Sequence, residues 1–117
     1  MRRVPLRTVP PADRRAEPGY REWHQPMYGL CSCCGERGSL ERHHVVREQD
    51  VRREHGQPWD LRNSVMLGRW CPCHRDHHTG AHRLPASLLT VPNLEFMVEL
   101  LGEHGAADYV VRHYRVG

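Results

Sequence analysis

The spacing of apolar residues predicts two helices in the last third of the chain. Two groups of residues follow the i, i+3, i+4, i+7 pattern that places side chains on one face of a helix. They are Leu94, Met97, Val98 and Leu101, followed by Ala106, Tyr109, Val110 and His113. Gly102 separates the groups and is typical of a helix end. We therefore expect residues 83–117 to form a tail of two short amphipathic helices packed onto the rest of the protein.

The middle of the chain has shorter, strand-like segments. Residues 40–46 end in β-forming side chains and follow a turn at 35–38, which predicts a strand or one arm of a hairpin. Residues 61–67 are typical of a loop that enters a second strand or a helix. The highly charged residues 47–56 are expected to form a surface loop or short helix, and residues 73–79 fit a short helix. Together these elements predict an α+β fold.

The first 24 residues carry no apolar periodicity and contain four prolines, so we expect an irregular arm. This segment holds six arginines against three acidic residues, whereas residues 25–117 hold eleven of each. The whole net charge of +3 therefore lies in the arm. A basic arm beside a neutral domain suggests a polyanionic partner such as nucleic acid, the alternative being a merely solvated tail.

Composition limits the classes of protein to consider. A chain of 117 residues with 38% hydrophobic residues has room for one small domain, whose thin core usually needs a metal or disulfide staple. No apolar run approaches the length of a membrane span. No apolar stretch follows the N-terminal arginines, so we expect no secretory signal, a cytoplasmic location and reduced thiols that are available to a metal.

The five cysteines fall into two clusters with metal-ligand spacing. Cys31 and Cys34 form a C-x2-C knuckle of the kind that directs two thiolates at one tetrahedral Zn²⁺. Cys71 and Cys73 are the candidate partner pair, although their C-x-C spacing is tighter than usual. Cys33 is then spare or replaces one of the four. Buried thiols and disulfides are the alternatives to a structural zinc that ties two distant loops together.

The histidines form two clusters of their own. His43 and His44 end the predicted strand at 40–46, where neighbouring side chains point to opposite faces. One of them is therefore expected to bind a metal ion while the other does something else. His74 and His78 are four residues apart on the predicted helix and point the same way, with His77 as a competing ligand.

Taken in chain order, these motifs resemble those of the HNH endonucleases, in particular the small zinc-stapled HNH proteins of phages and bacteria. The matching stretches are Cys31-x2-Cys34, Glu41-Arg42-His43-His44-Val45-Val46, Leu61-Arg62-Asn63 and Cys73-His74-x3-His78. The resemblance covers residues 28–82 and implies a ββα-metal core, in which two strands and a helix hold one divalent ion. Residues 25–117 would then form the nuclease domain, with the helical tail that is common in this group.

The resemblance also implies a role for each matching residue. His43, His74 and His78 correspond to ligands of the catalytic ion. His44 corresponds to the general base that takes a proton from the attacking water, and Asn63 to the residue that holds the loop and orients this base. One departure concerns the staple: the family usually has C-x2-C-H, whereas Cys71 comes one residue late after the strand. Either the loop bulges or Cys71 is not a zinc ligand.

These parts suit phosphodiester hydrolysis, which needs an activated water and a Lewis acid on the phosphate. We expect a DNA endonuclease, acting on double-stranded DNA, with structural Zn²⁺ and a catalytic Mg²⁺, Mn²⁺, Ni²⁺ or Zn²⁺. Arg42 and Arg75 flank the motif and are candidates for phosphate binding. By the same resemblance, phage packaging proteins are candidate partners, in a bacterial or phage-infected cell. The alternatives are an RNA substrate and a non-catalytic zinc-binding module that binds DNA or protein.

Overall fold

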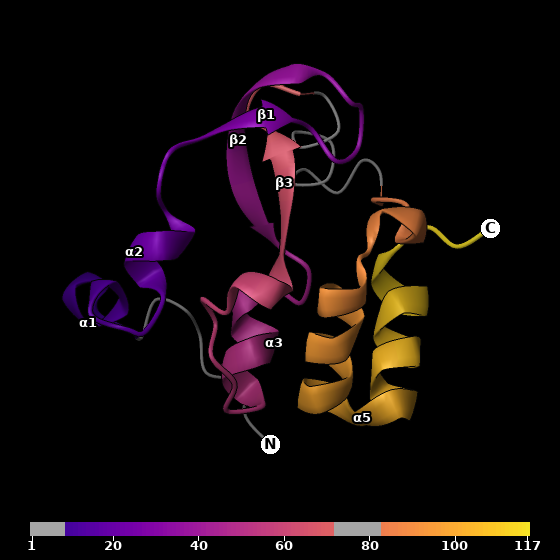
Figure 1. Ribbon diagram of the computed structural model, residues 1–117. Helices are drawn as coiled ribbons and strands as arrows, with labels where there is room; N and C mark the ends of the chain where they lie inside the picture. The colour runs from indigo at the N-terminus through magenta and orange to yellow at the C-terminus, as the bar shows by residue number, and fades with distance from the viewer. Residues whose placement is uncertain (1–8, 72–82) are drawn as a thin grey trace.

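Three strands form one antiparallel sheet in the computed structural model, which describes residues 9–71 and 83–117 (Figure 1). The strands are β1 (Met27–Leu30), β2 (Arg37–His44) and β3 (Ser64–Gly68), and β2 lies in the centre. At one end of the β2–β3 pair Leu40 is opposite Gly68, and at the other His44 is opposite Ser64. The strand predicted at 40–46 is present as β2 but begins and ends earlier, and of the two alternatives for 61–67 a strand, β3, follows a short 3-10 turn.

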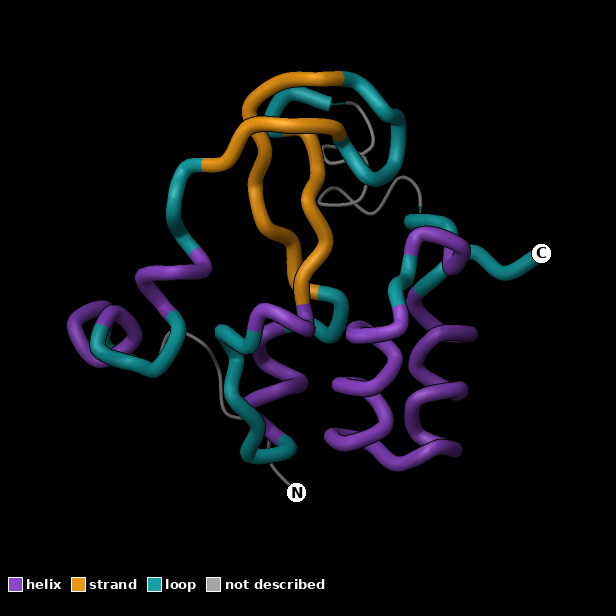
Figure 2. Tube along the Cα trace, viewed as in Figure 1, coloured by secondary structure: helices purple, strands orange, loops and turns teal. Residues whose placement is uncertain are grey.

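Helices gather at the end of the sheet where β2 finishes and β3 begins (Figures 1 and 2). They are α1 (Pro11–Arg15), α2 (Tyr20–Trp23), α3 (Glu48–Arg53) and α5 (Val91–His113), with 3-10 turns at Leu61–Asn63 and Ala86–Leu88. The sheet and these helices make a small α+β domain. No helix in the described ranges is both long enough and apolar enough to cross a membrane. The helix expected at 73–79 lies outside the described residues.

The tail forms the two expected helices as the two arms of α5. Gly102 interrupts the helix with a φ of 78° and a ψ of 168°, values that glycine adopts readily, and the arms lie side by side (Figure 1). The predicted apolar face is wrong at Leu94 and Val98, which are 44% and 41% exposed. The buried Asn93 sets the rotation of the first arm, because its Nδ2 donates to the backbone oxygens of Arg62 and Ser64 at 2.6 and 3.1 Å.

The N-terminal segment is not irregular where it is described, since residues 9–24 contain α1 and α2. Pro11 begins α1, and proline favours this position because its fixed φ suits a helix start and its missing N–H needs no partner there. Gly19, with a φ of 81°, precedes α2 and lies against the Trp59 backbone, where a Cβ would come within 2.7 Å of the Trp59 oxygen. The prolines therefore mark a helix start instead of excluding one.

Ion pairs fasten this segment to α3. The Glu17 carboxylate accepts two hydrogen bonds from Arg52, at 2.6 and 2.8 Å, and a third from Trp59 Nε1 at 3.1 Å. Arg14 donates two hydrogen bonds to Glu48, at 2.8 and 3.2 Å. Part of the charge assigned to a free basic arm is therefore neutralised inside the fold.

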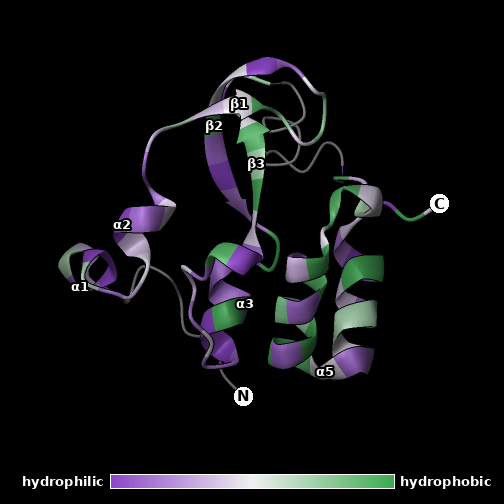
Figure 3. Cartoon of the chain, in the orientation of Figure 1, coloured by the Kyte–Doolittle hydropathy of each residue, from purple (hydrophilic) through white to green (hydrophobic). Residues whose placement is uncertain are grey.

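The core lies between β3, α3 and α5. Figure 3 shows the contrast between a hydrophobic β3 and a hydrophilic β2, and Leu67 of β3 is fully buried together with Met97 and Val51. The charged stretch 47–56 was expected at the surface, but Asp50 is only 1% exposed. Its burial is compensated because Tyr109 Oη donates to Asp50 Oδ2 at 3.0 Å and Arg53 forms an ion pair with it.

We expect Glu17→Gln to destabilise the protein in a pH-dependent way. The hydrogen bonds from Arg52 outweigh the effect of burial and lower the pKa of Glu17 below its ordinary 4.5. A lowered pKa means that the stabilisation is complete above about pH 4.5 and is lost as the pH falls through the folded-state pKa. Urea unfolding should show a loss of about 1 kcal/mol at pH 7 that shrinks below pH ~4. The exposed Glu22→Gln is the control, and a pH-independent difference would contradict the assignment.

Candidate functional site

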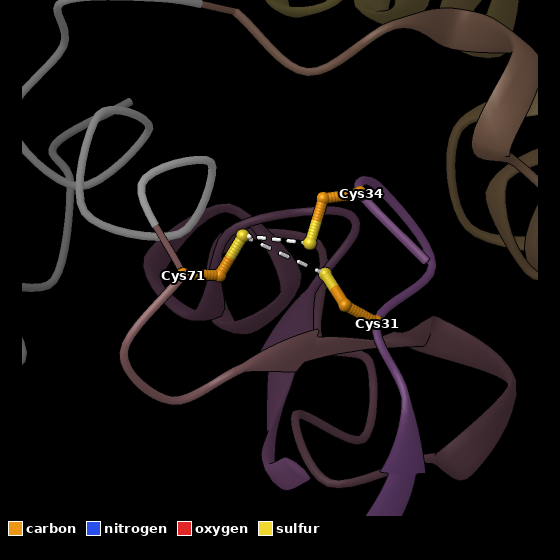
Figure 4. Close-up of side chains that lie close together, drawn as sticks. All are labelled: Cys31, Cys34 and Cys71. Atoms are coloured by element: carbon orange, nitrogen blue, oxygen red, sulfur yellow. Dashed lines mark hydrogen bonds between the residues drawn. The ribbon is translucent and has the colours of Figure 1, made fainter. Parts of the chain in front are cut away.

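Three thiols meet just after the ends of β1 and β3 (Figure 4). Cys71 Sγ lies 3.1 Å from Cys34 Sγ and 3.9 Å from Cys31 Sγ, and all three sulfur atoms lie within 4.8 Å of one another. These separations far exceed the ~2.05 Å of a disulfide bond. Four sulfurs around one Zn²⁺ at ~2.3 Å would lie about 3.8 Å apart. The cluster is therefore a candidate metal centre.

Two tight turns bring these cysteines together from distant parts of the chain. After β1, Gly35 N donates to Cys31 O at 2.9 Å, and the positive φ of Gly35, 78°, allows this turn. After β3, Cys71 N donates to Gly68 O at 3.1 Å. A Cβ at position 68 would lie 3.0 Å from Cys71 Cβ and 3.6 Å from Cys31 Cβ, so glycine permits the close approach of the two turns.

The geometry shows which of the five cysteines belong to the thiol cluster, as far as they are described. The turn at 68–71 places Cys71 in the cluster, so the late position of this cysteine after the strand does not remove it. Cys33 packs against the hydrophobic core and is not part of the cluster of described residues. Cys73, the fourth expected ligand, lies outside the described residues.

The surroundings of the thiols favour negative charge at Cys31 and oppose it at Cys34. Burial alone would raise the pKa of Cys31, but hydrogen bonds from the backbone N–H groups of Cys34, Gly68 and Cys33 lower it to about 7. At Cys34 a backbone hydrogen bond at Glu36 lowers the pKa, but the contacts with Cys71 and Cys31 more than offset it, and the pKa is raised. Neighbouring thiolates repel one another, so a cation is what allows all three to ionise together.

The strand end that carries the paired histidines lies at the other end of the β2–β3 pair. His43 is opposite Val65 and His44 is opposite Ser64, so the two imidazoles leave β2 on opposite faces. The His44 ring stacks on Trp23, with ring centroids 4.2 Å apart and an interplanar angle of 26°. Both histidines are half-buried.

One hydrogen bond fixes the orientation of the His44 ring. Its Nε2 lies 2.8 Å from the carbonyl oxygen of Pro58, and because a carbonyl can only accept, Nε2 must carry the hydrogen. The neutral ring then has its lone pair on Nδ1. Burial lowers the pKa of His44, and this effect outweighs the Pro58 hydrogen bond and the charge of Glu48, which raise it. At neutral pH the side chain is therefore an uncharged imidazole with a free Nδ1 lone pair.

Asn63 joins the chain just after His44 to the start of β3. Its buried side chain accepts a hydrogen bond from Val46 N at 2.7 Å and donates one to Val46 O at 2.9 Å. Its own backbone oxygen accepts from Val45 N at 3.0 Å. Three hydrogen bonds thus hold the segment that leaves β2, and with it the position of His44.

Of the other expected site residues, one lies in the described part of the chain and the rest do not. Arg42 Nη1 donates to Ser64 Oγ at 3.2 Å, so this arginine lies on the same face of β2 as His44. His74, His77, His78 and Arg75 lie outside the described residues. No sequence motif connects Trp23 or Pro58 with His44, because ring stacking and backbone carbonyls produce no pattern of residue types.

Comparison with known proteins assigns no family to this chain. No family model, curated protein or solved structure matches it. An inference about function therefore has to come from the motifs and from the geometry at the two ends of the β2–β3 pair.

We expect one tightly bound zinc ion per chain, which Cys31→Ala should remove. Metal binding contributes folding free energy directly, and losing about 2–3 kcal/mol would lower the Tm of a domain of this size by roughly 10–20 °C. Elemental analysis and calorimetry of the purified protein measure both effects. Cys33→Ala is the matched control, because it removes a thiol outside the cluster. Zinc-free wild-type protein, or equal zinc in both variants, would count against the centre.

Proposed function

We propose that the protein is a metal-dependent HNH endonuclease that hydrolyses phosphodiester bonds in DNA, with His44 as the general base. The observation that carries this proposal is the fixed orientation of His44, whose Nε2 donates to Pro58 O and whose Nδ1 keeps a lone pair. A base of this kind accepts a proton from water at neutral pH without first losing one of its own.

The fold supports a ββα-metal core at this site. β2 and β3 supply an antiparallel pair joined by a long loop, and the helix expected at 73–79 would follow Cys71. His43 leaves β2 beside His44 but on the other face, so in this proposal the two side chains have different roles, His43 as a metal ligand and His44 as the base. His74 and His78 would complete the ligand set from that helix, and the ion would act as a Lewis acid on the phosphate.

Asn63 fits the positioning role that the resemblance gives it. Its amide holds both backbone groups of Val46, two residues after His44, so a shift of this loop would carry the base with it. Trp23 stacks on one face of the His44 ring and so limits the movement of the ring. We infer that this base is held in place on two sides before substrate arrives, which reduces the cost of reaching a reactive geometry.

The thiol cluster has a separate role in this proposal. Cys31, Cys34 and Cys71 would bind a structural Zn²⁺, with Cys73 as the fourth ligand that the sequence suggests. A closed site of four thiolates leaves no open position for substrate, which is typical of structural zinc. The ion would hold the end of the β2–β3 pair that lies away from His44.

The main alternative is a non-catalytic zinc-binding module that binds DNA or protein. The thiol cluster alone suits this alternative equally well, since it requires no chemistry at the other end of the sheet. A half-buried imidazole with a fixed tautomer serves no purpose in such a module beyond packing. DNA is the partner we propose, and phage packaging proteins in a bacterial or phage-infected cell remain candidates by resemblance alone.

His44→Gln tests the proposal. Glutamine retains a donor for Pro58 O but lacks the basic ring nitrogen, so cleavage should fall by at least about 100-fold. Plasmid nicking is measured with Mg²⁺, Mn²⁺, Ni²⁺ or Zn²⁺, and single-stranded DNA and RNA are tested alongside. The exposed His104→Gln is the matched control.

Two results would decide against the nuclease. Nicking by His44→Gln at the wild-type rate would exclude His44 as the base. A wild-type protein that carries zinc but cleaves no nucleic acid with any of the four ions would favour the binding module. Preferential cleavage of RNA would retain the mechanism and change the substrate.

A further inference from the structure

A cluster of basic side chains forms where the end of α5 meets the segment that precedes it. Arg83 Nη1 donates to Val111 O at 3.3 Å, which holds this side chain against the second arm of α5. Pro85 and Arg115 form a parallel bridge, in which Arg115 N donates to Leu84 O at 2.8 Å. Two segments that each carry an exposed arginine therefore run side by side (Figure 1).

Further positive charge lies against the same part of the molecule. Arg47 N donates to Tyr109 Oη at 3.0 Å, and the Tyr109 ring lies 4.2 Å from the His113 ring. Burial lowers the pKa of His113, and the charges of Arg47, Arg83 and Arg112 lower it further, which outweighs the opposite effect of Asp50. We call these residues the C-terminal basic cluster: Arg47, Arg83, Arg112, His113 and Arg115.

Only two of the four arginines in the C-terminal basic cluster form an ion pair with a carboxylate of the described residues. Arg112 pairs with Asp108 at 2.9 Å, and Arg47 pairs at 3.2 Å with Asp50, which also pairs with Arg53. No carboxylate among residues 9–71 and 83–117 lies within ion-pair distance of Arg83 or Arg115. This is the reverse of the α1–α3 contact, where both arginines face glutamates.

The cluster lies beside the strand end that carries the paired histidines. Tyr114 Oη donates to Val45 O at 2.5 Å, and Val45 directly follows His44. Tyr114 lies between His113 and Arg115 in the chain, so this hydrogen bond holds the middle of the cluster against the end of β2. Trp23 stacks on the ring of His44.

We propose that the C-terminal basic cluster binds the phosphate backbone of DNA and places it beside His43 and His44. This inference rests on the proposed nuclease function and assigns its substrate-binding face. The guanidinium group matches phosphate oxygens with two parallel N–H donors, and each phosphate that is neutralised releases condensed counterions. Exposed arginines that have no carboxylate partner within 9–71 and 83–117, as at positions 83 and 115, suit this role because they need not break such an ion pair first.

Two double variants of equal charge test the location of this face. Arg83→Gln with Arg115→Gln removes two exposed arginines from the cluster, and Arg15→Gln with Arg21→Gln removes two exposed arginines from the N-terminal segment. Binding of a fluorescent 20-base-pair duplex is measured by anisotropy over a range of NaCl concentrations. A denaturing gel of each sample verifies that the duplex stays intact.

We expect the cluster variant to bind at least tenfold more weakly than wild type at about 100 mM salt, and the slope of log K against log[salt] to fall by about two. The Arg15 and Arg21 variant should stay close to wild type. Equal losses in the two variants, a loss confined to the N-terminal variant, or an unchanged cluster variant would each overturn the inference.

Plasmid cleavage measured in parallel separates this inference from the nuclease proposal. A wild-type protein that cleaves DNA, with a cluster variant that binds as tightly as wild type, would leave the nuclease intact and reject this binding face. A wild-type protein that binds the duplex through the cluster but cleaves nothing would support the face and reject the nuclease. A wild-type protein that does not bind the duplex would reject the face.

Discussion

The buried amide of Asn63 is the interaction on which the rest of the structure depends. It satisfies both backbone groups of Val46 and so closes the long loop that leaves β2, passes through α3 and returns at β3. Without it, two backbone groups would be buried with no partner, at a cost of about 1–3 kcal/mol each. The start of β3 is thereby fixed against the end of β2. Because His44 is two residues from Val46, its place follows from the same closure.

The β2–β3 pairing carries this constraint from one end of the sheet to the other. Leu40 pairs with Gly68 at the thiol end and His44 pairs with Ser64 at the histidine end, so a slip of one residue would disturb both ends. A slip would also move Leu67, which is fully buried, to the opposite face. Closing the turn at 68–71 with a metal ion would therefore hold the register that Asn63 sets. A metal ion bound by the thiol cluster would then stabilise the histidine end through the paired strands.

The spacing of residues predicted those features that depend only on neighbours in the sequence. The C-x2-C knuckle, the two strands and the glycine between the arms of α5 could be read from the sequence because each depends on neighbouring residues. Whether Leu94 faces the core depends instead on Asn93 reaching the backbone of Arg62, which lies far away in the chain. The helix that begins at Pro11 could not be predicted from the sequence, because its five residues are too few to show an apolar period. The Pro58 carbonyl beside His44 belongs to the backbone, so the residue type at position 58 does not predict this contact.

The distribution of charge over the surface could not be predicted from the sequence either. By composition, the N-terminal 24 residues hold all the excess positive charge and the remainder is neutral. In the fold, Arg14 and Arg52 face Glu48 and Glu17, so glutamates offset the basic residues along that contact. Arg83 and Arg115 meet no carboxylate of the described residues. A formally neutral domain can therefore present a positive face, because ion pairing depends on which side chains the fold brings together. The electrostatic field around the end of β2 is set by this pairing more than by net charge.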